Sequence, residues 1–491
     1  MSADARIAEL VAVDLGATSG RVMLARVGAG RLEIHEVNRF ANGPLPIWDG
    51  KRSALHWDVP GLFGHIRDGL AAASQQATDL IGIGIDSWAV DYGLLRDGRL
   101  LGLPFHYRDD RNHSGVNAVH EVIDPAVLYS RNGLQFLPFN TVYQLMAEKQ
   151  AGTLDLAEHA LLIPDLLGYW LTGQLATERT NASTTGLLGA DGRWDSDLER
   201  TLGLPVGLFP DLIDPGAVLG PVLPDITTQL GLPSAVTVSA VASHDTASAV
   251  AAVPMQPESS AYISCGTWAL VGVEVPNRVI APAARAANFT NEVGADGRIR
   301  FLRNVMGLWL LSESVRQWQR DGIAVDLPSL LDEAAQAQPP AEIFDADDAA
   351  FLPPGNMPAR IAHWYTDRGL PAPASPASMV RAILESLAEA FAQRVGEAAS
   401  LSGTDVEVVH IVGGGSKNRL LCQLTADRLG IAVLAGPVEA TAIGNVLVAA
   451  RAARLIADDP EAARGLVAAT FPPERFEPRP AAHATHLKVS R

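Results

Sequence analysis

The fold is decided by the stretch Val11–Leu24, which reads VAVDLGATSGRVML. An apolar strand runs into a small polar turn with a glycine, and a second apolar strand follows. The same order recurs at Ala261–Leu270 (AYISCGTWAL), where Gly266 takes the place of Gly16. Because a glycine turn leaves backbone N–H groups open to an anion, each hairpin is a candidate phosphate clamp. One such hairpin in each half of the chain predicts two related lobes.

The size and charge of the chain limit its class. With 491 residues, 48% of them hydrophobic, it is too long for one ordinary domain and long enough for two large cores. A formal net charge of −17 argues against nucleic acid or an anionic membrane as a partner. Two cysteines, Cys265 and Cys422, fit a reduced compartment and have no zinc-ligand spacing.

Targeting and membrane signals are missing from the sequence. The start, Met1–Arg6, lacks a signal-peptide pattern, and the most apolar stretch, Ile431–Ile456, is interrupted by proline and charged residues. We therefore expect a cytoplasmic globular protein without a membrane or nucleic-acid partner. The sequence does not fix the oligomeric state, and a monomer is compatible with it.

Strand-like and helical segments alternate along the chain, which indicates α/β lobes. Expected strands are Ile81–Asp86, Ala235–Ala242 and Val408–Val412. We place the lobe boundary near Ser243, so that residues 1–243 form one lobe and residues 244–491 the other.

Three further segments complete the expected organisation. A helix begins at Ser375-Pro376, and apolar residues recur at every fourth position from Met379 to Val395, which marks a buried face. The stretch 335–358 is rich in Pro, Ala and Asp and is expected to be a surface excursion. The Pro-rich tail 471–480 is expected to be extended.

The first hairpin turn has two interpretations. As a phosphate clamp it places Asp14 at a strand end, where the carboxylate can hold Mg²⁺ directly or through water, and turns Thr18–Arg21 toward the phosphates. As an ordinary hairpin it has only a polar turn. It matches neither a P-loop nor the Rossmann glycine spacing.

The triple glycine Gly413–Gly415 follows an apolar strand and precedes a helix that closes at Gly430. Such a turn lets a flat or anionic ligand approach the backbone at a helix N-terminus. The alternative is a tight strand-to-helix turn capped by Ser416 or Asn418.

The candidate base lies in Ser243–Ser248 (SHDTAS) at the lobe junction. Asp245 is placed to accept a hydroxyl proton during attack on a γ-phosphorus, with His244 as a hydrogen-bonding partner. The alternative is that Asp245 caps a helix beginning near Ala247.

Two more polar groups stand out, Asp86–Asp91 after an apolar strand and Asn304 before an apolar helix. Each also fits a local role, as a strand-end turn and as a helix cap. Trp88 and Trp309 are expected in the core or in a pocket wall.

Taken together, these strings resemble the FGGY carbohydrate kinases. The resemblance rests on the residues 13–21, 135–141, 242–250, 266–268, 304–311, 413–415 and 435–440, which follow the family's order along nearly the whole chain. It implies two ribonuclease-H-like lobes of the actin and hexokinase type with a cleft between them, the first lobe binding sugar and phosphate and the second the nucleotide. It also implies transfer of the γ-phosphate of ATP to the 1-hydroxyl of L-rhamnulose, giving L-rhamnulose 1-phosphate, with Mg²⁺.

The resemblance also implies site residues. Asp245 matches the proton acceptor. The positions that match sugar contacts are Ala89, His244, Asp245, Thr246 and Asn304, and those that match nucleotide contacts are Ala17, Thr18, Ser19, Gly20, Arg21, Thr267, Ser312 and Gly414. Two of them depart from the family pattern, because Ala89 stands where glycine is usual and Ser312 stands where glutamine is usual.

Other functions remain open at this point. A related kinase acting on L-fuculose, L-ribulose or D-xylulose has the same expected fold, which does not distinguish between them. A sugar-independent actin-like ATPase is a further alternative. A sugar-responsive regulator lacks a basic DNA-binding segment in this acidic chain.

Overall fold

We describe the protein from a computed structural model, which covers residues 6–479 and 488–489. The chain forms two compact units. The first takes the described residues up to Pro254 together with Val275–Phe301 and Ala440–Thr470, and the second takes Met255–Glu274, Leu302–Glu439 and the described residues from Phe471 onward. A segment from the C-terminal half of the sequence therefore completes the first unit.

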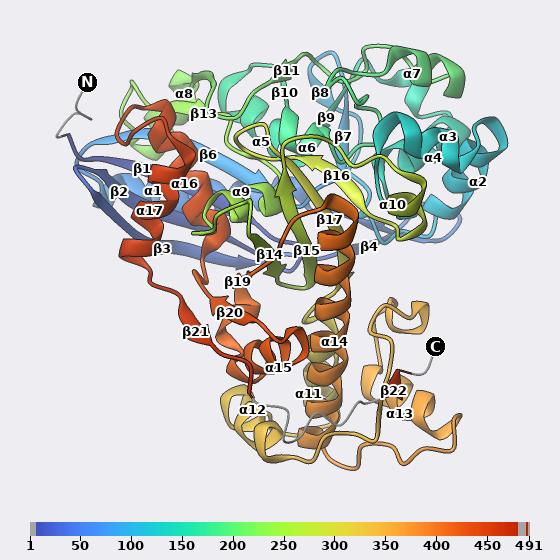
Figure 1. The fold of residues 1–491 in the computed structure, drawn as a ribbon. Coiled ribbons are helices and arrows are strands. Elements are labelled where there is room, and N and C mark those ends of the chain that lie inside the picture. Colours follow the sequence, from blue (N-terminus) through green and yellow to red (C-terminus); the bar gives the residue numbers. More distant parts are fainter. Residues whose placement is uncertain (1–5, 480–487, 490–491) are drawn as a thin grey trace. The chain divides into compact units, whose positions relative to one another are not determined.

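A six-stranded sheet lies at the centre of the first unit, in the order β12-β13-β6-β1-β2-β3 (Figure 1). Strand β1 pairs antiparallel with β2 and parallel with β6, and β6 pairs parallel with β13. The carboxyl ends of β1, β6 and β13 consequently meet at one edge of the sheet. The strands are β1 (Ala8–Leu15), β2 (Ser19–Gly28), β3 (Arg31–Ala41), β6 (Leu80–Ser87), β12 (Val218–Pro221) and β13 (Thr237–Ser239).

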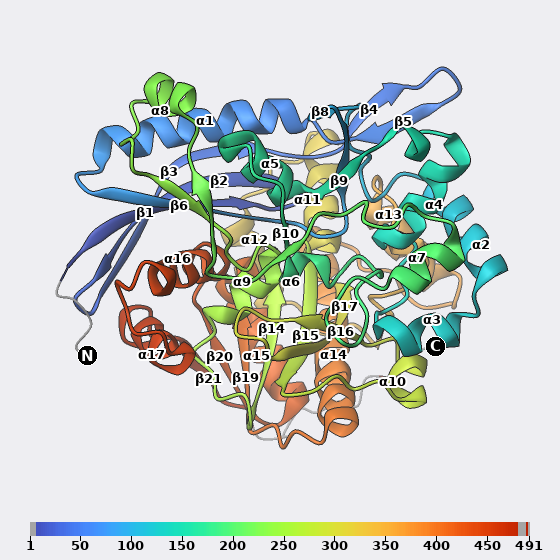
Figure 2. The same cartoon turned by 90° about the horizontal axis from the view of Figure 1, so that it is seen from above.

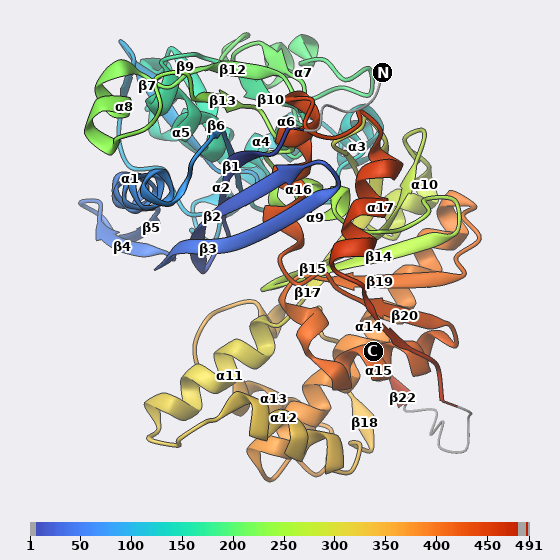
Figure 3. The same cartoon turned by 90° about the vertical axis from the view of Figure 1, so that its left-hand side faces the viewer.

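Helices cover both faces of this sheet. Val11 and Val13 of β1 pack into one apolar core with Ile66 of helix α1 (Val59–Gln76), which runs alongside the blue strands in Figure 2. Asp58 caps α1 by accepting a hydrogen bond from the Gly61 amide at 3.0 Å. Helix α16 (Ala440–Ala452) contacts β1 and β6 from the opposite side (Figure 3).

The rest of the first unit includes a second apolar core, to which α4 (Thr141–Ala151) contributes Leu145 and α7 (Ser196–Leu202) contributes Leu198. Its strands are β4 (Leu45–Trp48), β5 (Ser53–His56), β7 (Tyr92–Arg96), β8 (Arg99–Leu100), β9 (His159–Leu162), β10 (Thr177–Glu178), β11 (Leu212–Ile213) and β16 (Thr290–Val293). Its helices are α2 (Asn112–Val122), α3 (Pro125–Asn132), α4 (Thr141–Ala151), α5 (Ile163–Thr172), α6 (Arg179–Ala182), α7 (Ser196–Leu202), α8 (Pro224–Leu230), α9 (Asp245–Ala251), α10 (Pro282–Ala286) and α17 (Pro460–Thr470).

The second unit is built on strands in the order β17-β15-β14-β19-β20-β21. Strand β14 pairs antiparallel with β15 and parallel with β19, so this hairpin repeats the topology of β1 and β2. The strands are β14 (Ser260–Cys265), β15 (Trp268–Val275), β17 (Ile299–Met306), β19 (Val408–Val412), β20 (Ala432–Ala435) and β21 (Glu474–Phe476), and β18 (Glu342–Ile343) pairs separately with β22 (Lys488–Val489). Along the sequence, the units change after Glu274, next to the last residue of β15, and after Phe301, within β17.

The helices of the second unit include the one expected from Ser375. Helix α14 (Pro376–Ser402) starts with a capping box between Ser375 and Ser378, and its fourfold apolar positions are buried. The others are α11 (Trp309–Arg320), α12 (Leu327–Gln336), α13 (Met357–Thr366) and α15 (Arg419–Leu429). None of the helices within residues 6–479 has the length and apolar character needed to cross a membrane.

Three expectations need correction. The strand expected at 235–242 spans only Thr237–Ser239, because the pairing with β6 ends at Ser239 and Gly84. Stretch 335–358 is not a simple excursion, since Phe344 and Phe351 are buried with ring centroids 5.0 Å apart. The tail contains β21, paired antiparallel with β20, and Pro480 lies outside the described residues.

Candidate active site

Two aspartates lie side by side where β1 and β6 end. The parallel register sets Asp14 level with Asp86, and the antiparallel register sets Asp14 opposite Arg21. Both carboxyl groups are buried, and Arg21 Nη2 donates to Asp14 Oδ2. Asp14 therefore lies at a strand end, as expected, and it has a second acid, Asp86, and a cation, Arg21, beside it.

Asp86 has an unusual environment for a carboxylate. Asn445 Nδ2 of α16 donates to Oδ2 at 2.6 Å, whereas Oδ1 receives no hydrogen bond. Burial, reinforced by the Asp14 charge, raises the pKa of Asp86 well above its usual range. Asp86 is therefore a candidate to share either a proton or a cation with its neighbours.

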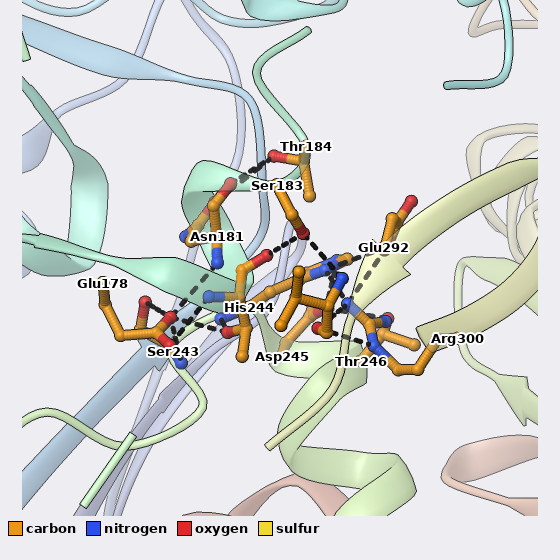
Figure 4. A network of polar contacts seen from close by, with 12 residues as sticks. Glu178, Asn181, Ser183, Thr184, Ser243, His244, Asp245, Thr246, Glu292 and Arg300 are labelled. Atoms are coloured by element: carbon orange, nitrogen blue, oxygen red, sulfur yellow. Dashed lines mark hydrogen bonds and ion pairs between the residues drawn. The ribbon is translucent and has the colours of Figure 1, made fainter. Parts of the chain in front are cut away.

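The segment after β13 brings Asp245 to the same edge of the sheet. Ser87, the last residue of β6, donates from its backbone to Ser243 O at 2.9 Å and forms a parallel bridge with His244. The carboxylate of Glu178 fixes this segment, because it accepts from the backbone N and the Oγ of Ser243 at 3.0 and 2.7 Å (Figure 4). The same carboxylate caps α6 by accepting from the amides of Thr180 and Asn181.

Asp245 is the first residue of α9, and His244 is its N-cap. The alternative in which Asp245 caps a helix starting near Ala247 is therefore wrong. Its Oδ1 accepts from Thr246 Oγ1 at 3.0 Å, and 30% of the side chain remains exposed. Burial raises the pKa of Asp245, while the nearby His244 opposes that shift. A carboxylate that is accessible and has a raised pKa is suited to general-base work.

His244 lies between two acids and an arginine, as Figure 4 shows. Its Nε2 is 3.5 Å from Asp245 Oδ1, and its Nδ1 is 3.3 Å from Glu292 Oε2 and 3.1 Å from Arg300 Nη2. Burial acts to raise the pKa of Glu292, but the adjacent Arg300 charge is the first of the interactions that oppose burial, and this pKa lies below its usual range. Glu292 is thus held as a carboxylate within the protein.

Hydrogen bonds within the turn and from the Asn42 side chain hold the turn of the first hairpin in place. Gly16 N donates to Ser19 O at 2.9 Å, and the Asn42 side chain donates to Gly16 O at 2.8 Å. Thr18 is exposed, with Ala17 and Ser19 half-buried beside it. At Gly20 a Cβ would lie 2.2 Å from the Phe40 ring, so any larger residue there would force the Phe40 side chain to move.

Ala89 lies in the loop after β6, directly before a residue with a strained backbone. Val90 has φ +67°, in the left-handed region that β-branched residues rarely occupy. The Thr141 hydroxyl donates to Val90 O at 2.7 Å and helps to hold this conformation. Ala89 is half-buried, while Trp88 is buried against Trp57 with ring centroids 4.0 Å apart, so of the two positions expected for Trp88 the structure has the core.

In the second unit, two expected nucleotide positions lie on neighbouring turns. Thr267 is in the β14–β15 turn, and Gly414 follows β19, which pairs with β14. A Cβ on Gly415 would lie 2.5 Å from Cys265 Sγ, so the two turns pack closely. The glycine stretch forms a 3-10 turn before α15. Asn418 caps α15, because its side chain accepts a hydrogen bond from Leu421 N at 3.0 Å.

Ser312 and Asn304 are also in this unit. Ser312 is half-buried in the first turns of α11, whose first residue, Trp309, donates from its backbone to Thr267 O at 3.2 Å. This bond joins α11 to the turn that carries Thr267. Asn304 lies within strand β17, so the alternative in which it caps the following helix is wrong.

The acids at the sheet edge fit a nucleotide-bound magnesium ion. Among the described residues no group of three or more His, Cys, Asp or Glu is arranged to hold a metal. Mg²⁺ typically takes only one or two carboxylates from a protein and completes its shell with phosphate and water. Asp14 and Asp86 supply that number, and the buried Asp86 Oδ1 without a hydrogen bond is the kind of oxygen that a hard cation coordinates.

Sequence reasoning missed several buried polar residues around Asp245. Glu178, Glu292, Arg300 and Asn445 are each at most 5% exposed and contact the segment or the acids described above. The available signal was a polar residue inside an apolar run, as in Ile299–Leu302 and Ile443–Val448, because such residues are buried only when they have partners.

Comparison with known families supports the two-part organisation. The model of the FGGY family of carbohydrate kinases, N-terminal domain, matches residues 10–252, and the model of the C-terminal domain of that family matches residues 261–453.

Curated relatives cover most of the chain. A protein named rhamnulokinase from Klebsiella pneumoniae (strain 342) is 43% identical over 446 residues, which are 90% of this chain and 88% of that protein. A rhamnulokinase from Pectobacterium carotovorum subsp. carotovorum (strain PC1) is 42% identical over 481 residues, or 96% of this chain and 94% of the relative.

Solved structures share the fold at low identity. The ligand-bound xylulose kinase from Lactobacillus acidophilus matches with a TM-score of 0.76 and 19% identity, covering 96% of this chain and 94% of that chain. The glycerol kinase of Plasmodium falciparum with ADP matches with a TM-score of 0.74 and 16% identity, covering 96% and 94%. The expected fold, two α/β domains of the actin and hexokinase type, is confirmed, and the chain belongs to the FGGY family of carbohydrate kinases.

Proposed function

We propose that this carbohydrate kinase transfers the γ-phosphate of ATP to the 1-hydroxyl of L-rhamnulose and forms L-rhamnulose 1-phosphate, a step of rhamnose catabolism. Relatives at 42–43% identity that bear the name rhamnulokinase support this choice of sugar. The observation that carries the chemistry is Asp245, an accessible carboxylate at the sheet edge beside Asp14 and Asp86.

Asp245 acts as the general base. Its carboxylate accepts the proton of the sugar hydroxyl as that oxygen forms a bond to the γ-phosphorus, and the bond from that phosphorus to the bridging oxygen breaks, so ADP leaves. A raised pKa makes Asp245 a stronger proton acceptor than an ordinary surface aspartate.

The remaining site residues are assigned to the two substrates. Ala89, His244, Thr246 and Asn304 contact the sugar together with Asp245. The nucleotide contacts are Ala17, Thr18, Ser19, Gly20, Arg21, Thr267, Ser312 and Gly414. Backbone N–H groups in the two hairpin turns and in the glycine turn suit phosphate oxygens, which is why small residues serve there.

Asp14, together with Asp86, holds Mg²⁺ in this proposal, directly or through water. The ion, when bound with the nucleotide, neutralises charge on the phosphoryl oxygens. Arg21, which pairs with Asp14, adds a positive charge at the same edge of the sheet.

The assigned contacts are divided between the two sequence halves. Residues 1–243 provide Ala89 and the nucleotide positions 17–21, and residues 244–491 provide the base, the other sugar contacts and the nucleotide positions Thr267, Ser312 and Gly414. Segment Ala440–Thr470, although late in the sequence, packs within the first compact unit and supports the acids there.

Measuring ADP release with MgATP across a panel of ketoses tests this function. The panel holds L-rhamnulose, L-fuculose, L-ribulose, D-xylulose and a sample without sugar. We expect release that depends on L-rhamnulose and far exceeds that with the other sugars. A preference for another ketose would keep the kinase and overturn the substrate. Equal slow release in every sample would overturn the sugar kinase and favour an actin-like ATPase.

A further inference from the structure

We propose that Arg300 is a positioning residue that holds His244 in its Nε2–H tautomer, with that proton directed at Asp245. The inference rests on the proposed role of Asp245 as the base. It concerns residues buried behind the base, on β16 and β17, that lie outside every motif noted in the sequence.

The donors around Nδ1 determine which nitrogen carries the proton. Arg300 Nη2 lies 3.1 Å from His244 Nδ1, and a guanidinium has only donors. A neutral imidazole has one N–H and one acceptor nitrogen, so a bond from Arg300 requires Nδ1 to be the acceptor. The single ring proton then resides on Nε2.

Glu292 competes with Arg300 for Nδ1, because its carboxylate would accept a hydrogen bond from a protonated Nδ1. The geometry of Glu292 nevertheless favours the Nε2–H tautomer. Its Oε2 lies 3.3 Å from Nδ1 but receives no hydrogen bond, and it forms an ion pair with Arg300 Nη2 at 3.1 Å. A proton on Nδ1 would point toward the guanidinium as well as toward Glu292. Glu292 therefore serves chiefly to balance the buried charge of Arg300.

Arg300 is anchored firmly enough to impose this choice. Its side chain is 0% exposed, and both Nε and Nη2 donate to Val293 O at 3.2 Å. Val293 is tied in turn, since its backbone N donates to Ser183 Oγ at 2.9 Å. The guanidinium thus has little freedom to turn away from His244 (Figure 4).

The tautomer matters because of what faces the other nitrogen. His244 Nε2 lies 3.5 Å from Asp245 Oδ1, close enough for the proton on Nε2 to stabilise the carboxylate and to orient it. A lone pair at Nε2 would repel the same oxygen. Arg300 therefore keeps the base ionised and in place without touching it.

Nitrogen NMR of the full chain labelled at histidine tests the tautomer directly. The chain has 12 histidines, and the signal of His244 is the one absent from the His244→Asn variant. At mildly alkaline pH we expect a protonated Nε2 and an unprotonated Nδ1 in the unmodified protein. A proton on Nδ1, alone or together with one on Nε2, would overturn the proposal.

Variants at Arg300 supply the kinetic readout. Arg300→Met removes the donor, so we expect the His244 proton to move to Nδ1 and kcat to fall roughly 10- to 100-fold, the scale of a misplaced catalytic group, with a smaller change in the sugar KM. Arg300→Lys retains a cationic donor, so we expect it to restore part of the Nε2–H tautomer population and part of kcat. An unchanged tautomer in Arg300→Met would contradict the proposal.

A matched control separates this role from simple destabilisation. Arg131→Met breaks a more exposed ion pair elsewhere in the first unit, in which Arg131 donates to Asp195 at 2.7 Å, and is expected to lower stability while leaving kcat and the His244 signal unchanged. The NMR measurement needs no substrate. It therefore distinguishes failure of this inference from failure of the proposed function, in which no sugar is phosphorylated.

Discussion

Asn445 donates a hydrogen bond from Nδ2 to Asp86 Oδ2 at 2.6 Å and so joins helix α16 to the end of strand β6 across 359 positions of sequence. The approach is close because Gly84, on the same strand, has no side chain, and a Cβ there would lie 2.2 Å from Asn445 Oδ1. The late segment of the chain thereby supports an acid at the candidate site.

Asn445→Ala removes this donor and leaves Asp86 buried without a partner at either oxygen. We expect the free energy of unfolding to fall by about 1–3 kcal/mol, the usual cost of an unsatisfied buried polar group. Urea denaturation measures it. Asn38→Ala, which removes a surface amide bonded to His65 O, is the control and should cost less than about 1 kcal/mol. Equal losses in the two variants would contradict a special role for Asn445.

Gly444→Ala tests how closely α16 packs on α9. A Cβ at Gly444 would lie 1.7 Å from Ser248 O, so α9 or α16 must shift, and we expect lower stability together with lower kcat because α9 begins at Asp245. Gly465→Ala on α17 has nothing within 4 Å and should stabilise by about 0.5–1 kcal/mol through helix propensity alone. The two melting temperatures should therefore move in opposite directions.

Asp245→Asn keeps the shape of the side chain and removes the base. We expect kcat to fall on the order of 10²–10⁴-fold, the range of general-base catalysis, while calorimetric affinities for sugar and ADP stay close to normal. Asp197→Asn, at an exposed carboxylate, is the control and should leave kcat unchanged. Near-normal turnover in Asp245→Asn would remove Asp245 from the mechanism.

Ala89→Gly restores the residue usual at this position of the family. Losing one methyl group from a sugar pocket changes discrimination by roughly 1–3 kcal/mol at most. We expect a higher KM for the preferred ketose and a narrower gap in kcat/KM between that ketose and the rest of the panel. An unchanged ranking and unchanged KM values would show that the methyl group does not line the sugar site.

Asp91→Asn should alter the pH dependence of stability. Burial raises the pKa of Asp91 to about 7 despite hydrogen bonds from Gln144, Trp57, Trp88 and the Tyr107 amide. In the unfolded chain the carboxyl ionises near pH 4, so between pH 4 and 7 the native state holds more protons than the unfolded state. The contribution of Asp91 to stability is thus present at low pH and lost as pH rises toward 7.

The measurement for Asp91 is the difference in unfolding free energy between the unmodified protein and Asp91→Asn. As pH rises from about 4 to about 7, the unfolding free energy of the unmodified protein should fall relative to that of Asp91→Asn, by at most about 1.4 kcal/mol per pH unit. Asp110→Asn, at an exposed position, should show no such slope. A pH-independent difference for Asp91→Asn would mean that Asp91 is ionised throughout.

Much of the fold was predictable because its signals are local. The β1–β2 hairpin, its repeat at β14–β15 and the capped helix α14 each follow from apolar periodicity and turn residues within a short window. The approach of Asp14 to Asp86 was not predicted, because it depends on the register between two strands far apart in sequence.

The sequence by itself determined the hairpin repeat, the strand-end aspartates, the glycine turns and the resemblance to a kinase family. Only the tertiary structure decided that α16 completes the first unit and that Glu292 and Arg300 surround His244. The physical reason is that periodicity records which face of an element is buried. The choice of partner for a buried charge depends instead on packing between segments that the sequence keeps far apart.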